Sequence, residues 1–213
     1  MVPDLGAFLA LAQSCGPAVA PATLLSVVHV ESRFDPLAIG VNGAAPRRLS
    51  PATPAEAVRI ATTLIAAGRN IDLGLGQINS KNLGWLGLSV ADAFDPCRNL
   101  AASAKVLQAG YAPTDPTIAA EQTALRAALS RYNTGHPTRG LRNGYVAKVT
   151  AAASQYVPAI AVSGPDAAPT PDASAQLTPR ATTSPTWDVF GRAASRWDGG
   201  FVFTPASSQG DIQ

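Results

Sequence analysis

Charged residues are scarce in this sequence of 213 residues, at 14% of the total, and the formal net charge is only +2. Among the basic residues only Arg47 and Arg48 are adjacent, so the sequence lacks the basic stripe that nucleic-acid binding requires. Histidine is also rare, because His29 and His136 are the only two. We therefore expect no nucleic-acid partner and no metal site, and we expect both histidines to be structural.

Long hydrophobic runs are missing as well. Gly16, Pro17 and Pro21 divide the apolar N-terminal segment into pieces too short to cross a bilayer. No Lys or Arg precedes Leu5, so this segment is also a poor signal peptide and no export signal is evident. We expect an amphipathic helix over residues 3–13 instead, in a protein that is peripheral to a membrane at most.

The sequence contains two cysteines, Cys15 and Cys97. They could be two separate buried thiols or a single disulfide. A pair of cysteines in an exported protein more often forms a disulfide, which would close a long loop and restrict the unfolded chain. We expect the disulfide, although the sequence alone leaves both states open.

Hydrophobic residues are abundant, at 46%, and many of them are alanines, which favour helices. Helical spacing of apolar residues, capping residues and prolines in first turns together indicate a mainly helical protein. The further helices that we expect cover residues 21–32, 54–68, 96–111, 117–131 and 145–156. Residues 36–52 are expected to form a loop, with a possible tight turn at Asn42 and Gly43.

The composition changes near the end of the chain. Residues 1–157 are expected to form the folded domain, and residues 158–186, rich in Pro, Ala, Ser and Thr, a disordered linker. Residues 187–213 form a tail with five large aromatic residues: Trp187, Phe190, Trp197, Phe201 and Phe203. Exposed aromatic side chains suggest docking onto a partner, or alternatively packing back onto the protein's own surface.

Three polar clusters could carry chemistry. Glu31 ends an apolar run, where burial would disfavour its charged form and suit it to general-acid catalysis. The glycines between residues 74 and 79 let backbone approach a ligand closely, and Gln77 and Asn79 offer amide groups that bind sugars. The third cluster covers residues 132–135. Each cluster also has an ordinary interpretation. Glu31 could be a surface residue or a helix-capping acid, residues 74–79 could be a plain turn, and residues 132–135 could simply end a helix.

Together with Tyr145-Val146, and in this order, the three clusters resemble the four motifs of soluble-type lytic transglycosylases. The matching segments are Glu31-Ser32-Arg33-Phe34, residues 74–79, residues 127–135 and Tyr145-Val146. The resemblance covers about residues 3–158 and is closest to the transglycosylase subunit of type IV secretion and conjugation systems. It implies a mainly α, lysozyme-like α+β fold with a small irregular or β-containing lobe near residues 39–80. A substrate cleft would lie between the two lobes.

The resemblance also implies a mechanism. Glu31 would be the sole catalytic acid/base, cleaving the bond between N-acetylmuramic acid and N-acetylglucosamine in peptidoglycan without a metal or cofactor. The substrate's own N-acetyl group would assist, and an anhydromuramic end would form. Ser32 would shape the site beside Glu31, and Tyr145 would hydrogen-bond the Glu31 carboxyl.

Four further residues would line the sugar cleft or support Glu31: Gln77, Asn79, Tyr132 and Asn133. Gly76 departs from the family, because many members carry Met there. The same glycine-rich segment also resembles animal lysozymes, with Asp72 at its head. A lysozyme-type hydrolase that uses Asp72 as a second carboxylate is therefore an alternative.

The resemblance places the protein in the periplasm of a Gram-negative bacterium. Its substrate would be peptidoglycan glycan strands, and its tail would bind components of a type IV secretion channel. A non-catalytic, wall-binding scaffold is a second alternative, against which the intact Glu31 argues.

Overall fold

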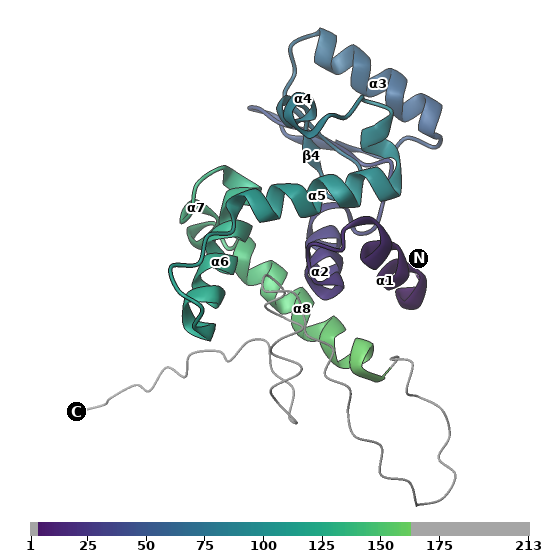
Figure 1. The fold of residues 1–213 in the computed structure, drawn as a ribbon. Coiled ribbons are helices and arrows are strands. Elements are labelled where there is room, and N and C mark those ends of the chain that lie inside the picture. Colours follow the sequence, from purple (N-terminus) through teal and green to yellow (C-terminus); the bar gives the residue numbers. More distant parts are fainter. Residues whose placement is uncertain (1–3, 163–213) are drawn as a thin grey trace, which may run out of the picture.

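The computed structural model describes residues 4–162. These residues form two lobes, a larger helical one and a smaller one that contains a four-stranded antiparallel sheet (Figure 1). Helix α5 (Pro96–Gly110) runs between the lobes and contacts both (Figure 1). The predicted mainly helical fold with a small β-containing lobe is confirmed.

The helical lobe is organised around one apolar helix. Its elements are α1 (Leu5–Cys15), α2 (Pro21–Ser32), α6 (Ile118–Thr134), α7 (Arg139–Arg142) and α8 (Tyr145–Val162). Leu24, Leu25, Val27 and Val28 of α2 are completely buried, and α2 packs against α1, α5 and α8. A helix with so many buried apolar residues lies in a core, and α2 therefore organises this lobe.

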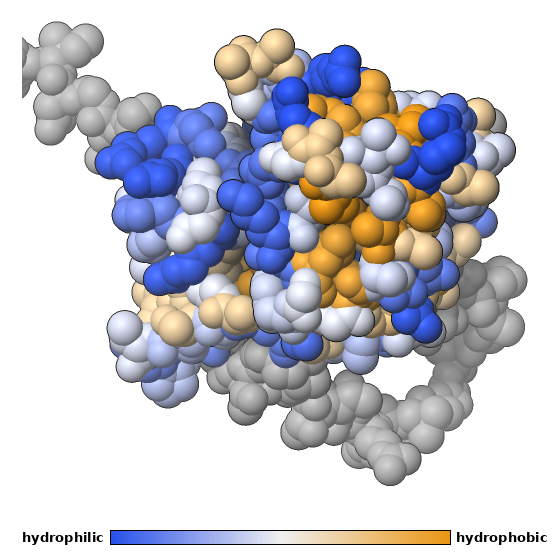
Figure 2. All heavy atoms as spheres, turned by 90° about the horizontal axis from the view of Figure 1, so that it is seen from above, coloured by the Kyte–Doolittle hydropathy of each residue, from blue (hydrophilic) through white to orange (hydrophobic). Residues whose placement is uncertain are grey.

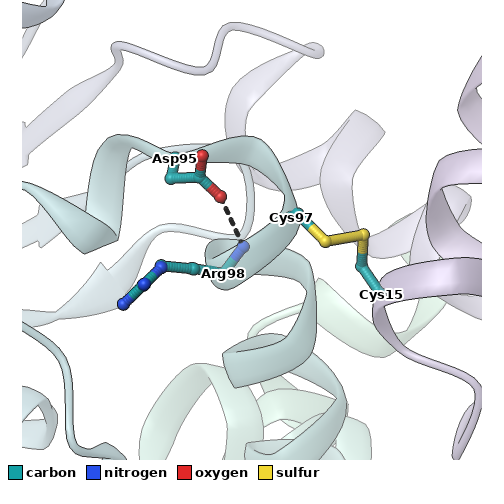
Figure 3. Close-up of a disulfide and its surroundings, with 4 residues drawn as sticks. All are labelled: Cys15, Asp95, Cys97 and Arg98. Carbon is teal, nitrogen blue, oxygen red and sulfur yellow. Dashed lines mark hydrogen bonds between the residues drawn. A yellow bond between two sulfur atoms is a disulfide. The ribbon is translucent and has the colours of Figure 1, made fainter.

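The helix starts follow local sequence signals. Thr53 accepts a hydrogen bond from the Glu56 amide at 3.2 Å and caps α3 (Pro54–Ala66). Asp95 caps α5 in the same way, because its carboxylate accepts from the Arg98 amide at 2.8 Å (Figure 3). Both helices have proline in the first turn, where the missing amide proton costs nothing.

The expected disulfide between Cys15 and Cys97 is present. It joins the last residue of α1 to the first turn of α5, with 5.1 Å between the two Cα atoms (Figure 3). The bond therefore ties the N-terminal helix to the helix that runs between the lobes.

The sheet of the small lobe has the strand order β2-β1-β3-β4. Its strands are β1 (Ile39–Val41), β2 (Arg47–Leu49), β3 (Ile71–Leu73) and β4 (Ile78–Asn79). The expectation that residues 36–52 form a loop was therefore wrong, since β1 and β2 lie there. Strands of three residues are too short to show the alternation of apolar and polar residues that identifies a strand in sequence.

A second hydrophobic core lies under this sheet. Ile39, Ile71 and Leu73 are fully buried in it, together with Ala57 and Ala61 of α3. The connection to α5 consists of short helices: η1 (Ser80–Asn82), α4 (Leu83–Leu86) and η2 (Asp92–Phe94). Seen from above, onto this lobe, hydrophobic side chains gather at the centre of the surface with hydrophilic ones around them (Figure 2).

Two helices extend beyond their expected ends. Helix α6 continues to Thr134, where Gly135 ends it in the left-handed conformation with φ 69°, so Tyr132 and Asn133 belong to its last turn. Helix α8 continues to Val162 rather than ending near Tyr156. No helix among residues 4–162 is long and apolar enough to cross a membrane.

The predicted linker covers residues 158–186, but residues 158–162 belong to α8, so the disordered segment does not begin at residue 158. Residues 163–186 and the whole aromatic tail lie outside the described residues and remain predictions.

Candidate active site

Glu31 lies in the last turn of α2, where the helix stops abruptly. Arg33 and Phe34 both adopt left-handed backbone conformations, with φ of 54° and 66°, and the Arg33 amide closes the helix on the His29 carbonyl oxygen at 3.1 Å. Left-handed conformations are uncommon for residues other than glycine, so the surrounding structure must hold this turn in place. The turn leaves the half-buried Glu31 at the edge of the helical core.

Tyr145 holds the Glu31 carboxyl. Its hydroxyl donates a hydrogen bond to Glu31 Oε1 at 2.6 Å, across 114 positions of sequence, as the resemblance predicts. Tyr145 is itself 6% exposed and begins α8, where its amide donates to Asn143 Oδ1 at 3.0 Å. The hydroxyl is therefore fixed by a packed ring and a defined helix start.

Burial raises the pKa of the Glu31 carboxyl from 4.5 to about 7. The hydrogen bond from Tyr145 opposes this rise, because it stabilises the charged form. Asp72 raises the pKa further by charge repulsion, and Arg48 lowers it. A carboxyl group with a pKa near 7 can both give and take a proton at neutral pH, which suits one residue to acting as acid and then as base.

Arg48 is a contributor that the sequence did not identify. This exposed residue of β2 donates from Nη1 to the Glu31 carbonyl oxygen at 3.1 Å and from Nη2 to the Ser32 carbonyl oxygen. It thereby satisfies carbonyl groups at the C-terminus of α2, where a positive charge is favourable. It also connects the small lobe directly to the residue that carries the candidate acid.

Asp72 shares a cavity with Glu31. Asn42 and Asn79 each donate a hydrogen bond to it at 2.7 Å, one to each carboxylate oxygen. Burial raises the pKa of Asp72, while these two hydrogen bonds lower it. Asp72 therefore lies inside the cleft, where its two oxygens accept hydrogen bonds from neighbouring amides.

Gln77 and Asn79 line the same cavity, but their amide protons already have protein partners. Gln77 Nε2 donates to the carbonyl oxygens of Ala38 at 3.1 Å and Gly74 at 2.8 Å. Asn79 Nδ2 donates to Asp72 Oδ1 at 2.7 Å and to Asn70 Oδ1 at 2.9 Å. In this structure both side chains therefore brace the floor of the cleft.

Tyr132 braces the glycine-rich segment from the other lobe. Its hydroxyl donates to the Gly76 carbonyl oxygen at 2.6 Å and lies 3.1 Å from Ser103 Oγ. A Cβ atom on Gly76 would lie 2.0 Å from Ser103 Oγ and 2.6 Å from the Tyr132 hydroxyl. Many family members carry methionine at position 76, but in this structure Ser103 and Tyr132 leave no room for a side chain there.

Asn133 and Ser32 occupy different surroundings. Asn133 is exposed beside Glu31, and its Oδ1 accepts from Asn143 Nδ2 at 2.9 Å. Ser32 is completely buried, and its hydroxyl donates to the Val28 carbonyl oxygen at 3.2 Å. Ser32 thus stabilises the end of α2 from within.

A buried asparagine, also missed in the sequence, supports the glycine-rich turn. Asn99 of α5 is completely buried, donates to the carbonyl oxygens of Leu73 and Ala93, and accepts from the Gly76 amide at 2.7 Å. Gly74, with φ 71°, leaves the room that Asn99 requires, since a Cβ atom there would lie 2.5 Å from its Nδ2 atom. No local pattern marked Asn99, because its partners lie on another segment.

Glu31 and Asn133 line two cavities that meet between the lobes. The sheet-side cavity, of about 610 Å³, is lined mainly by polar residues of the small lobe and the end of α6. The helix-side cavity, of about 640 Å³, is lined by residues at the end of α2 and the start of α8. Within residues 4–162 no cluster of three or more His, Cys, Asp or Glu residues could hold a metal ion.

Comparison with known proteins identifies the family. The transglycosylase SLT domain matches residues 8–153. This chain belongs to that family. The family and the enzyme class predicted from the motifs are confirmed, and with them the lysozyme-like fold.

Two relatives illustrate how far the similarity extends. The chain is 40% identical over 180 residues to protein virB1 of Agrobacterium fabrum (strain C58), covering 84% of this chain and 69% of that protein. It is 44% identical over 176 residues to the type IV secretion system protein virB1 of Brucella suis biovar 1 (strain 1330). That match covers 80% of this chain and 73% of that protein. No solved structure matches the chain with comparable significance.

Proposed function

We propose that this SLT transglycosylase cleaves peptidoglycan glycan strands between N-acetylmuramic acid and N-acetylglucosamine and leaves an anhydromuramic end. The observation that carries this proposal is the single carboxyl group of Glu31, with its pKa raised to about 7 and its position fixed by Tyr145, where two cavities meet. One such carboxyl group can donate a proton in the first step of a non-hydrolytic cleavage and accept a proton in the second.

In the first step the protonated Glu31 gives its proton to the glycosidic oxygen, and the bond from this oxygen to C1 of the muramoyl sugar breaks. The N-acetyl group of that sugar stabilises the positive charge that develops. In the second step the Glu31 carboxylate takes the proton from a hydroxyl of the same sugar while its oxygen bonds to C1. This attack is intramolecular, so water has no comparable advantage.

In these steps Tyr145 positions the carboxyl group and stabilises its charged form between them. Asp72, Asn79 and Gln77 hold the small-lobe side of the cleft through the hydrogen bonds described above. Tyr132 holds the glycine-rich turn, and Asn133 stands beside Glu31 at the junction of the cavities.

The test is to identify the products released from purified sacculi. The wild type should release muropeptides with anhydromuramic ends, and Glu31→Gln should release them at least about 100-fold more slowly. Glu56→Gln is the matched control, because it makes the same change at the N-terminus of α3 and lines neither cavity. A Glu31→Gln protein that clears sacculi at the wild-type rate would contradict the proposal.

A lysozyme-type hydrolase remains the second candidate because Asp72 shares the sheet-side cavity with Glu31. The amides of Asn42 and Asn79 occupy one position on each of its oxygens, which favours a bracing role over a nucleophilic one. Asp72→Asn should therefore keep substantial activity and still give anhydromuramic ends. Reducing ends from the wild type, with Asp72→Asn as inactive as Glu31→Gln, would favour the hydrolase.

We further propose that the enzyme works in the periplasm and opens the wall locally for a type IV secretion system. This context rests on the virB1 relatives. Residues 187–213 would bind a channel component. A chain that ends after Val162, the end of α8, should keep wall cleavage but lose secretion. If a full-length Glu31→Gln chain restores secretion in a deletion strain, the scaffold role would be the essential one.

A further inference from the structure

The helix-side cavity differs in charge from the sheet-side cavity. Arg33 and Lys148 line it, with His29, Asn143 and Gln155, and Glu31 is its only acidic residue. The sheet-side cavity also has two cations, Lys81 and Arg131. There the two carboxyl groups of Glu31 and Asp72 balance them, and several amide side chains complete the lining. Amides suit an uncharged sugar chain, whereas an excess of positive charge suits an anionic group.

The position of Arg33 depends on the left-handed turn after α2. Phe34 anchors this turn, because its ring packs edge-on against Phe8, His29 and Tyr156, with centroid separations of 5.4, 5.8 and 6.2 Å. His29 and Tyr156 are also hydrogen-bonded to each other. These aromatic contacts thus hold an unfavourable backbone conformation that leaves Arg33 exposed at the cavity.

Lys148 reaches the cavity from α8, three residues after Tyr145 and therefore on the same face of that helix. The ion pair found among residues 4–162 joins Arg98 to Asp92. Neither Arg33 nor Lys148 is thus neutralised by an acidic side chain of the described part of the chain. Both are exposed cations beside a cavity that begins at the candidate acid.

The proposed substrate carries an anionic branch next to the bond that is cleaved. Each muramoyl sugar bears a lactyl group on its ring, and the peptide stem attached to it has free carboxylates. The branch leaves the same ring whose C1 bond is cleaved, so it starts within one sugar of Glu31.

We propose that the helix-side cavity is a subsite for the carboxylates of this peptide stem, bound by Arg33 and Lys148. The inference rests on the proposed cleavage of peptidoglycan. The volume of the helix-side cavity, about 640 Å³, lies within the range of about 300–1,000 Å³ that is usual for ligand pockets. The enzyme would therefore prefer strands that still carry their stems over bare glycan.

The test compares two substrates, intact glycan strands and the same strands after an amidase has removed the stems. The ratio of kcat/KM on the first to kcat/KM on the second should fall about two- to fivefold in Arg33→Gln or Lys148→Gln, and more in the double variant. Lys148→Arg keeps the positive charge and should therefore keep the wild-type ratio. Matched controls are Arg126→Gln and Lys105→Gln, two exposed helical residues that line neither cavity, and they should leave the ratio unchanged.

A ratio that stays at the wild-type value in the double variant would overturn the subsite. Amidating the stem carboxylates should lower the wild-type ratio as well, and an unchanged ratio would likewise count against the subsite. If the wild type leaves no anhydromuramic ends on either substrate, the proposed function fails instead. Calorimetric binding of a soluble disaccharide peptide then tests the subsite alone, with weaker binding expected for Lys148→Gln and equal binding overturning the proposal.

Discussion

Replacing Glu31 by Gln should make the protein more stable at neutral pH, although it removes the candidate catalytic group. Folding raises the pKa of this carboxyl from 4.5 to about 7, chiefly through burial. One pKa unit corresponds to about 1.4 kcal/mol, so ionised Glu31 lowers the free energy of unfolding by about 3 kcal/mol. Gln is neutral and can still accept the Tyr145 hydrogen bond, so it avoids this cost.

The stability difference between Glu31→Gln and the wild type should depend on pH, and its direction follows from the raised pKa. Below pH 4.5 the carboxyl is protonated in both the folded and the unfolded chain, and Glu31→Gln should match the wild type. As the pH rises the unfolded chain ionises first, so the wild type loses stability until the pH passes about 7, the folded pKa. Above pH 7 the variant should have a melting temperature about 6–12 °C higher.

Urea and thermal unfolding at pH 4 and pH 8, with the disulfide intact, would measure both differences. If the advantage of Glu31→Gln is equal at the two pH values, or if it is a loss at pH 8, the carboxyl is not held in the environment described.

Further outcomes follow from individual contacts. Tyr145→Phe removes a hydrogen bond that lowers the pKa of Glu31, so the alkaline limb of the pH profile of kcat/KM should move up by about one unit while kcat falls. An unmoved limb would contradict this role. Arg48→Gln loses hydrogen bonds to two carbonyl groups at the end of α2, and urea unfolding should show a loss of about 1 kcal/mol. Wild-type stability in this variant would show that the contact is unimportant. Cys15→Ser should cost about 2–4 kcal/mol, and reductant should destabilise the wild type to the same level but leave the variant unaffected.

Much of the helical structure was predictable because its signals are local. Pro21 and Pro96 lie in the first turns of α2 and α5, and Thr53 caps α3, as the sequence predicted. The apolar run that ends at Glu31 predicted a helix over residues 21–32, and in the structure that run is buried in α2. The order of the motifs identified the family, since no arrangement in space is needed to recognise it.

The small lobe was harder to predict. Its strands contain two or three residues each, and they are held by pairing with strands distant in sequence, such as Val41 with Ile71. The end of α6 was placed too early because Tyr132-Asn133-Thr134-Gly135 resembles a helix stop throughout, yet only Gly135 adopts the left-handed conformation. Local composition does not choose among neighbouring stop residues when packing can extend a helix by one turn.

The sequence by itself thus determined the residue types of the site, with Glu31 at the end of an apolar helix and amide side chains after a glycine-rich turn. Only the tertiary structure decided what each group does there. It brought Tyr145 within 2.6 Å of Glu31, placed Arg48 on the end of α2, and directed the amides of Gln77 and Asn79 toward protein partners. The physical reason is that burial, charge and hydrogen bonding depend on distances between segments far apart in the chain, and the pKa of Glu31 is the sum of those effects.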